Sequence, residues 1–131
     1  RSTPLYSSAA SDVYKRQALY SYAKEFTKNG DAIEIGSYCG KSAVYIGSAV
    51  KKNSQKLYSV DHHKGSEEQQ PGEEFFDPDL VDASGNGIDT LPHFLETIRS
   101  SGLENFVIPI VSSSKQAHED LKINLNNHEN N

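Results

Sequence analysis

The stretch AIEIGSYCGKSAV, residues 32–44, runs from an apolar, strand-like segment into a turn between Gly36 and Gly40, and then into a helical pattern. A strand that ends in a glycine-containing turn before a helix is typical of α/β proteins that bind nucleotides or nucleoside cofactors. The run Gly40-Lys41-Ser42 resembles the end of a phosphate-binding loop. The first question is therefore which ligand this turn holds.

Two phosphate-binding motifs fit the turn poorly. A Walker-type loop needs four residues between its glycine and Gly-Lys-Ser/Thr, whereas Gly36 and Gly40 enclose only three. A dinucleotide-binding G-x-G-x-x-G turn has a glycine where its backbone approaches the pyrophosphate, and Tyr38 occupies that position here. The sequence therefore departs from each phosphate-binding motif at one position of the loop.

Acidic residues at two strand ends favour a different ligand. Glu34 precedes the turn in the pattern E-x-G-x-x-x-G, and its carboxylate can accept from an ammonium group but repels a phosphate. The free N–H groups at the start of the following helix can bind a carboxylate. Asp61 lies 25 residues after Gly36, where an acidic side chain can accept both hydroxyls of a ribose.

An ammonium, a carboxylate and a ribose together describe S-adenosylmethionine. The alternative is that Glu34 is a solvated strand end, that the glycines only form a turn, and that Asp61 caps a loop.

A strand–helix–strand unit surrounds the turn. The sequence predicts strands at 31–36 and 56–61 with a helix at about 40–52 between them, and an earlier helix at about 18–28. Such a unit implies parallel strands and a right-handed crossover.

The second half adds a helix and a third strand. Asp89 or Thr90 can cap a helix whose first turn contains Pro92. A strand is expected at 105–111, and because Pro109 cannot donate to a ladder, that strand should lie at a sheet edge. The fold class predicted is α/β, a Rossmann-like, doubly wound, mainly parallel sheet with flanking helices, of which strands one to three form an incomplete half.

The composition excludes several classes of partner. The chain has 131 residues, which suits one domain, and its net charge of −5 without a basic run argues against nucleic acid. No apolar run approaches the roughly 20 residues of a membrane span. The single cysteine, Cys39, excludes an internal disulfide framework and fits a cytoplasmic location.

Both ends of the chain differ from the middle. Residues 1–17, RSTPLYSSAASDVYKRQ, have no clear period and resemble translated adapter sequence, so we expect a non-native or disordered leader. Residues 126–131 are rich in asparagine and predict a disordered tail. The folded domain is expected at 18–125, with a helical turn at 115–122 and the start of a fourth strand in KINLN, 122–126.

The acidic segment 62–88 is long for a loop in a compact domain. It is either a lid over the acceptor site, with Phe75 and Phe76 as apolar contacts, or a disordered loop. His62 directly follows Asp61 and can edge an adenosine pocket. His62 and His63 are adjacent, and adjacent residues of an extended segment point to opposite faces. The pair is therefore more typical of a polar loop than of a metal site.

The residues EIGSYCGKSAV resemble the first motif of class I S-adenosylmethionine-dependent methyltransferases, in the E-x-G-x-Y-C-G-x-S variant of catechol O-methyltransferase-like enzymes. LYSVDHH is similar to the acidic second-strand motif of that family, and the segment up to DTLPHFLETI resembles a bacterial branch of it. The resemblance covers about residues 30–115.

The resemblance implies a cofactor site at the strand ends. Glu34 and Gly36 would line the methionine end, Tyr38 would shape the turn, Ser42 would bind the cofactor carboxylate, and Asp61 would hold the ribose. The candidate cofactor-binding residues are Glu34, Gly36, Ser37, Tyr38, Gly40, Ser42, Asp61, His62 and Ser114, with Ser113 or Ser114 near the adenine.

The resemblance implies methyl transfer to a small-molecule acceptor. Family members have a fourth strand beside the first, followed by acidic residues that bind metal or act on the acceptor, whereas this chain continues into INLNNHENN. The resemblance therefore predicts that the chain is an N-terminal fragment with an open, apolar edge at strand 31–36. It assigns no catalytic residue. The alternatives are an NAD-linked oxidoreductase and a non-catalytic fragment.

Overall fold

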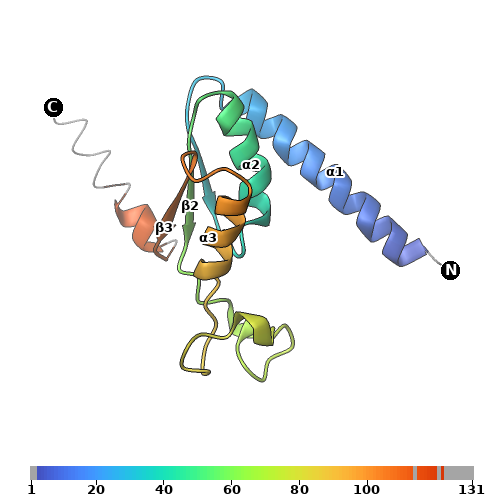
Figure 1. The fold of residues 1–131 in the computed structure, drawn as a ribbon, viewed down its shortest axis with the longest axis vertical. Helices are drawn as coiled ribbons and strands as arrows, with labels where there is room; N and C mark the ends of the chain where they lie inside the picture. Colours follow the sequence, from blue (N-terminus) through green and yellow to red (C-terminus); the bar gives the residue numbers. More distant parts are fainter. Residues whose placement is uncertain (1–2, 114, 121, 123–131) are drawn as a thin grey trace.

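The structure, a computed structural model, describes residues 3–113, 115–120 and 122. Its centre is a three-stranded sheet of β1 (Ala32–Ile35), β2 (Leu57–Asp61) and β3 (Val107–Val111). Both neighbouring pairs are parallel and the order is β1-β2-β3. The predicted partial Rossmann-like α/β fold is therefore confirmed, and β3, which carries Pro109, lies at an edge as expected (Figure 1).

Three long helices accompany the sheet, besides the helical residues 115–120 and 122. They are α1 (Thr3–Phe26), α2 (Lys41–Lys52) and α3 (Leu91–Ser100). Pro92 lies in the first turn of α3 as predicted. The N-cap residue Thr90 makes no side-chain cap, and Asp89 instead accepts the N–H of Leu91 through Oδ1 at 3.1 Å. No helix among the described residues is long and apolar enough to cross a membrane.

The first helix is much longer than expected. The sequence predicts a helix at 18–28, but α1 begins at Thr3 and ends at Phe26. Residues 3–17 contain no glycine, and their one proline, Pro4, suits a first turn. Helical propensity therefore extends α1 through a segment that lacks an apolar period. Figure 1 shows its N-terminal half leaving the body of the molecule.

The core lies between the sheet and one layer formed by α2 and α3. Its buried members are Ala43, Val50, Leu57, Phe94, Ile98, Leu103 and Val107. Gly47 of α2 permits close packing, because a Cβ there would lie 2.7 Å from Cγ2 of Val107. This layer holds the start of α2 against the carboxyl ends of the strands.

The outer side of β1 is open in the part of the chain that the structure describes. β1 pairs with β2 alone, so its other edge is open, as expected from the sequence. Ile33 and Ile35 project from the sheet face opposite the core and are 53% and 65% exposed. The expected fourth strand at 122–126 lies outside the described residues apart from Lys122, which is helical, as are residues 115–120.

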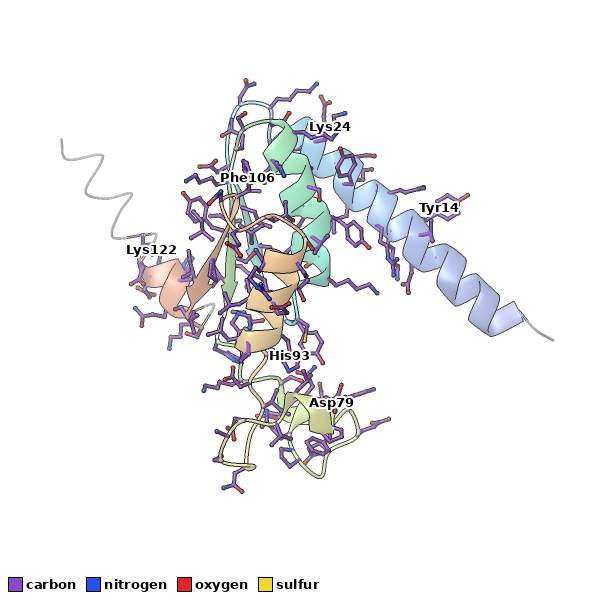
Figure 2. All side chains as sticks on the ribbon, viewed as in Figure 1. Tyr14, Lys24, Asp79, His93, Phe106 and Lys122 are labelled. Atoms are coloured by element: carbon purple, nitrogen blue, oxygen red, sulfur yellow. The ribbon has the colours of Figure 1, made fainter. Side chains whose placement is uncertain are left out.

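Residues 62–88, which we call the acidic arm, form an ordered excursion rather than an irregular loop. The arm contains two short 3₁₀ helices, Glu67–Gln69 and Pro78–Leu80, and an antiparallel bridge between Val81 and Ile88. Leu80 and Ile88 are buried at its base. The arm also approaches α3, where Nε2 of His93 lies 3.2 Å from the carbonyl oxygen of Asp79 (Figure 2).

Candidate functional site

The turn after β1 has an unusual backbone at three positions. Gly36, Tyr38 and Gly40 have φ values of 90°, 48° and 94°, all in the left-handed region. The N–H of Gly36 donates to the carbonyl of Val60 at 2.8 Å, which ties the turn to the end of β2. The φ of Gly40 favours glycine, and a Cβ there would crowd Cδ2 of Phe94 at 3.1 Å.

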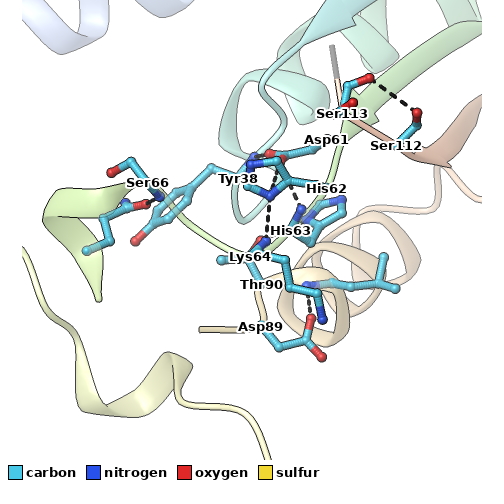
Figure 3. A network of polar contacts seen from close by, with 12 residues as sticks. Tyr38, Asp61, His62, His63, Lys64, Ser66, Asp89, Thr90, Ser112 and Ser113 are labelled. Atoms are coloured by element: carbon cyan, nitrogen blue, oxygen red, sulfur yellow. Dashed lines mark hydrogen bonds and ion pairs between the residues drawn. The ribbon is translucent and has the colours of Figure 1, made fainter. Parts of the chain in front are cut away.

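Asp61, the last residue of β2, joins the turn to the arm. Its Oδ2 accepts the N–H of Tyr38 at 2.7 Å, and its Oδ1 accepts the N–H of His63 at 2.9 Å (Figure 3). Burial alone would raise the pKa of Asp61, but these two backbone hydrogen bonds, with the neighbouring histidines, bring it below its ordinary value. The side chain is therefore an ionised, oriented acceptor.

The hydrogen bonds leave Asp61 with acceptor capacity. Each carboxylate oxygen has about two lone-pair sites, and each uses one of them for a backbone N–H. One lone pair remains on each oxygen, and the two oxygens of one carboxylate have the spacing that two adjacent hydroxyls require. Asp61 can therefore accept both hydroxyls of a cis-diol.

Glu34 is also held in a fixed position. Its Oε2 accepts from the hydroxyl of Ser42 and its Oε1 from the hydroxyl of Ser59, each at 2.8 Å. The two serines come from α2 and β2, so three elements meet at this carboxylate. Glu34 keeps free lone pairs for a cationic group. The hydroxyl of Ser42 donates to Glu34, and the role in carboxylate binding that the resemblance implies for it stays a prediction.

Ser37 provides the hydroxyl that lacks a partner. It is 2% exposed, and its Oγ makes no hydrogen bond with any described residue. A buried polar atom without a partner is costly unless a ligand or water completes it. Ser37 lies in the middle of the turn, so a ligand there could satisfy it.

The turn separates two cavities. One, of about 360 Å³, is lined by residues of the turn, of β2 and of the arm: Gly36, Tyr38, Asp61, His62, Gly65, Ser66, Gln69 and Thr90. The other, of about 300 Å³, lies between the turn and α1, and includes Ser37, Lys41 and Ser42. Gly36 and Tyr38 line both, so a ligand bound across the turn can reach into each.

The two adjacent histidines differ in environment. His62 is exposed, and its Nδ1 accepts the backbone N–H of Lys64 at 2.9 Å, which places the proton of the neutral ring on Nε2. His63 is 1% exposed, has a φ of 61°, and shares a 2.7 Å hydrogen bond between Nδ1 and the Thr90 hydroxyl. Burial lowers the pKa of His63, against the opposite effect of Asp61 and Asp89.

His63 and Thr90 were missed in the sequence as parts of the site. They join the two ends of the arm, because the N–H of Thr90 also donates to the carbonyl of His63 at 2.9 Å. The only sequence signal is a pair of polar residues at the two boundaries of a long loop, which is common in proteins without such a contact.

The remaining candidates lie at the margin of the site. Ser112, just after β3, donates its N–H to the carbonyl of Asp61 at 3.1 Å, so the chain after β3 begins beside the site. Ser113 is exposed and its Oγ accepts the N–H of Gln116. Ser114 lies outside the described residues.

Neither thiol nor metal chemistry is indicated by the described residues. Burial, followed by the charges of Asp77 and Asp61, raises the pKa of the Cys39 thiol, so the reactive thiolate is disfavoured. Among the residues that the structure describes, no three histidine, cysteine or acidic side chains cluster as a metal ligand set.

A comparison with protein families gives an independent result. A family model described as a methyltransferase domain matches residues 33–129. The matched region begins in β1 and includes the turn, Asp61, the arm, α3 and β3.

Proposed function

The chain belongs to this methyltransferase-domain family, and on that premise we propose that it binds S-adenosylmethionine at the turn and Asp61 for methyl transfer to a small molecule. The first motif supports a place in the catechol O-methyltransferase-like branch. The single cysteine and the net charge of −5 suit a cytoplasmic protein that does not bind nucleic acid.

The observation that carries the proposal is the geometry of Asp61. Its carboxylate is oriented by the N–H groups of Tyr38 and His63 and retains a lone pair on each oxygen. It also lines the 360 Å³ cavity beside the turn. A nucleoside whose ribose donates both hydroxyls to Asp61 would lie in this cavity, with His62 at its edge.

The amino-acid end of the cofactor would lie at the turn. Glu34 is held by Ser42 and Ser59 and keeps lone pairs for an ammonium group. The unpartnered hydroxyl of Ser37 is a better candidate than Ser42 for the cofactor carboxylate, because Ser42 already donates to Glu34. The N–H groups at the start of α2 would add to the binding of this anion.

The chemistry requires alignment more than strong catalysis by side chains. A bound S-adenosylmethionine supplies an electrophilic methyl group on a positively charged sulfur, and the acceptor forms its new bond to that carbon as the carbon–sulfur bond breaks. The residues described here orient the cofactor and keep its charged groups paired. A hydroxyl acceptor also needs a base, and we assign none.

Calorimetric titration with S-adenosylhomocysteine tests the proposal. We expect saturable binding by the wild-type chain and about 10- to 100-fold weaker binding by Asp61→Ala, because a hydrogen bond to a charged group contributes about 1.5–3 kcal/mol. Glu119→Ala removes an exposed carboxylate outside the site and is the matched control. Equal affinity of Asp61→Ala and Glu119→Ala would contradict the proposed site.

A parallel titration with NAD separates the closest alternative. NAD also carries ribose diols, so Asp61 alone does not discriminate against it. Tyr38 occupies the position where a dinucleotide turn needs glycine. We expect no NAD binding at ligand concentrations that saturate with S-adenosylhomocysteine, and preferential binding of NAD would replace the methyltransferase proposal for this chain.

A further inference from the structure

The first turn of the acidic arm forms one wall of the cavity that contains Asp61. Gly65 has a φ of +73°, which turns the chain back beside the end of β2. A Cβ on Gly65 would lie 3.2 Å from Oε1 of Gln69 and 3.2 Å from Cγ2 of Ile88. The glycine therefore lets Gln69 pack closely over the start of the arm, with Asp61 in the same cavity.

The side chain of Gln69 has one end fixed and the other end unused. Its Oε1 accepts the backbone N–H of Ser66 at 2.8 Å, and the backbone N–H of Gln69 donates to the carbonyl of Ser66 at 3.1 Å. With Oε1 held, the direction of the amide group is set. Its Nε2 carries two N–H donors and makes no hydrogen bond with any residue that the structure describes.

Asp61 cannot satisfy a diol by itself. A hydroxyl group donates one hydrogen bond and can accept two, whereas an ionised carboxylate only accepts. The oxygens of a diol bound to Asp61 therefore need a donor from another wall of the cavity. Thr90, which also lines it, is already engaged with His63. Tyr38, His62 and Ser66 line the cavity too, and Gln69 differs from them in having an amide whose direction is fixed by its bond to Ser66.

We propose that Gln69 of the acidic arm is a specificity-determining residue, which donates from Nε2 to the hydroxyl oxygens of a nucleoside diol held by Asp61. This inference rests on the proposed function, because it assumes a ligand with a ribose in that cavity. It gives the arm a role in recognition of the cofactor. The arm then contacts the ribose side of the site in place of the acceptor side expected for a lid.

Gln69→Glu is the sharpest variant, because it changes the donors and keeps the local fold. Ser66 and Gln69 have the spacing of a capping box, in which glutamate and glutamine both accept the N-cap N–H. The variant therefore keeps the bond to Ser66 and loses both N–H donors. Gln69→Asn, which is uncharged and shorter by one methylene, is a second variant that retracts the amide from the diol.

The experiment compares two ligands on the full chain, S-adenosylhomocysteine and its 2′,3′-dideoxy analogue. The added charge of Gln69→Glu acts on both ligands alike, so the ratio of their dissociation constants isolates the hydroxyls. We expect Gln69→Glu to weaken binding of S-adenosylhomocysteine about 10-fold, with little change for the dideoxy analogue. Gln69→Asn should likewise reduce the preference for S-adenosylhomocysteine, measured as the dissociation constant of the dideoxy analogue divided by that of S-adenosylhomocysteine.

The outcomes distinguish this inference from the proposed function. If the wild type binds S-adenosylhomocysteine and Asp61→Ala weakens it, but neither Gln69 variant changes the ratio, the role of Gln69 is wrong and the cofactor site stands. Equal losses for both ligands would likewise overturn it, since they would reflect a disturbed arm. If the wild type binds neither ligand, the proposed function itself fails.

Discussion

The turn between β1 and α2 and the acidic arm border the same cavity, but they are held in place by different means. The turn is fixed by the sheet, through the bond from Gly36 to Val60, and by α3, through the contact of Gly40 with Phe94. The arm is fixed at its base by two buried residues, Leu80 and Ile88, by the contacts of His63 with Thr90 and of Asp79 with His93, and otherwise by local turns.

The turn therefore has a fixed geometry, whereas the arm can change conformation on its own. Residues on the sheet, such as Asp61, can move only if the core moves, so their geometry is available before a ligand binds. Residues on the arm, such as Gln69, depend on a small local core and can open without unfolding the sheet. Four predictions test this division, from the largest expected effect to the smallest.

Ile88→Ala should open the arm and spare the sheet. Ile88 is 1% exposed, and truncation of a buried isoleucine costs about 2–5 kcal/mol. We expect faster proteolysis within residues 66–87 and weaker binding of S-adenosylhomocysteine, with the far-ultraviolet circular dichroism of the helices retained. Phe75→Ala, which removes a large side chain that is 63% exposed, is the matched control and should change neither. Loss of the whole fold in Ile88→Ala would refute the independence of the arm.

Gly40→Ala should have the opposite character and lower the stability of the whole domain. A methyl group at Gly40 would crowd Phe94 at 3.1 Å, and a side chain at the φ of 94° strains the backbone, which costs about 1–3 kcal/mol. Urea denaturation followed by circular dichroism measures the loss. Gly72→Ala is the control, since Gly72 also has a positive φ, of 88°, but has no atom within 4 Å of the added Cβ. A loss no greater than in Gly72→Ala would show that the contact with Phe94 does not matter.

Mild acid should destabilise the contact between His63 and Thr90. Burial keeps the pKa of His63 below its ordinary value of about 6.5, so in this range the unfolded chain binds more protons than the folded one. The contribution of the neutral ring is complete above that ordinary value, and stability falls as the pH is lowered through it. Urea midpoints between pH 8 and pH 5 should show this slope in the wild type and less of it in His63→Gln. His118→Gln, at an exposed position, should retain the wild-type slope.

Deletion of residues 1–17 should have the smallest effect. Every buried member of the core cluster lies between Ala43 and Val107, outside the leader. The main loss that we expect is the cation–π contact of Arg16 with Tyr45, at 5.7 Å, which is worth about 0.5–1 kcal/mol. Asp12, Lys15 and Arg16 also line the second cavity, where Ser37 lies, so the dissociation constant for S-adenosylhomocysteine should rise, but by less than in Asp61→Ala. An unchanged dissociation constant would show that the cofactor does not reach the cavity beside α1.

The strands of the sheet were predictable because their apolar sequence pattern and their packing in the core favour the same structure. Strands expected at 31–36, 56–61 and 105–111 occur at Ala32–Ile35, Leu57–Asp61 and Val107–Val111. The edge position of β3 followed from the missing N–H of Pro109 alone. The predicted start of the first helix was wrong. The prediction depended on an apolar period, which begins only near residue 18, whereas helical propensity extends α1 back to Thr3.

The positions of the candidate residues were predictable where they depend on the ends of strands. Glu34 and Asp61 flank the turn as their spacing in a βαβ unit indicated, whereas their role in cofactor binding stays a prediction. The lack of a partner for the Ser37 hydroxyl could not be read from the sequence. The arm was not predictable, because its shape depends on pairing between distant residues, such as Val81 with Ile88. Neither residue is distinguished in the sequence from the apolar residues beside it.

The contact between His63 and Thr90 closes the arm at a single point of the sheet layer, since the N–H of Thr90 reaches the carbonyl of His63 at 2.9 Å. Everything between these two residues can be regarded as one closed insertion. The entropy of closing a loop grows only slowly with length, by about 0.6 kcal/mol for each doubling. Homologous proteins could therefore carry arms of very different length, or change ligand preference by exchanging the arm, while the sheet and its turn keep the same framework.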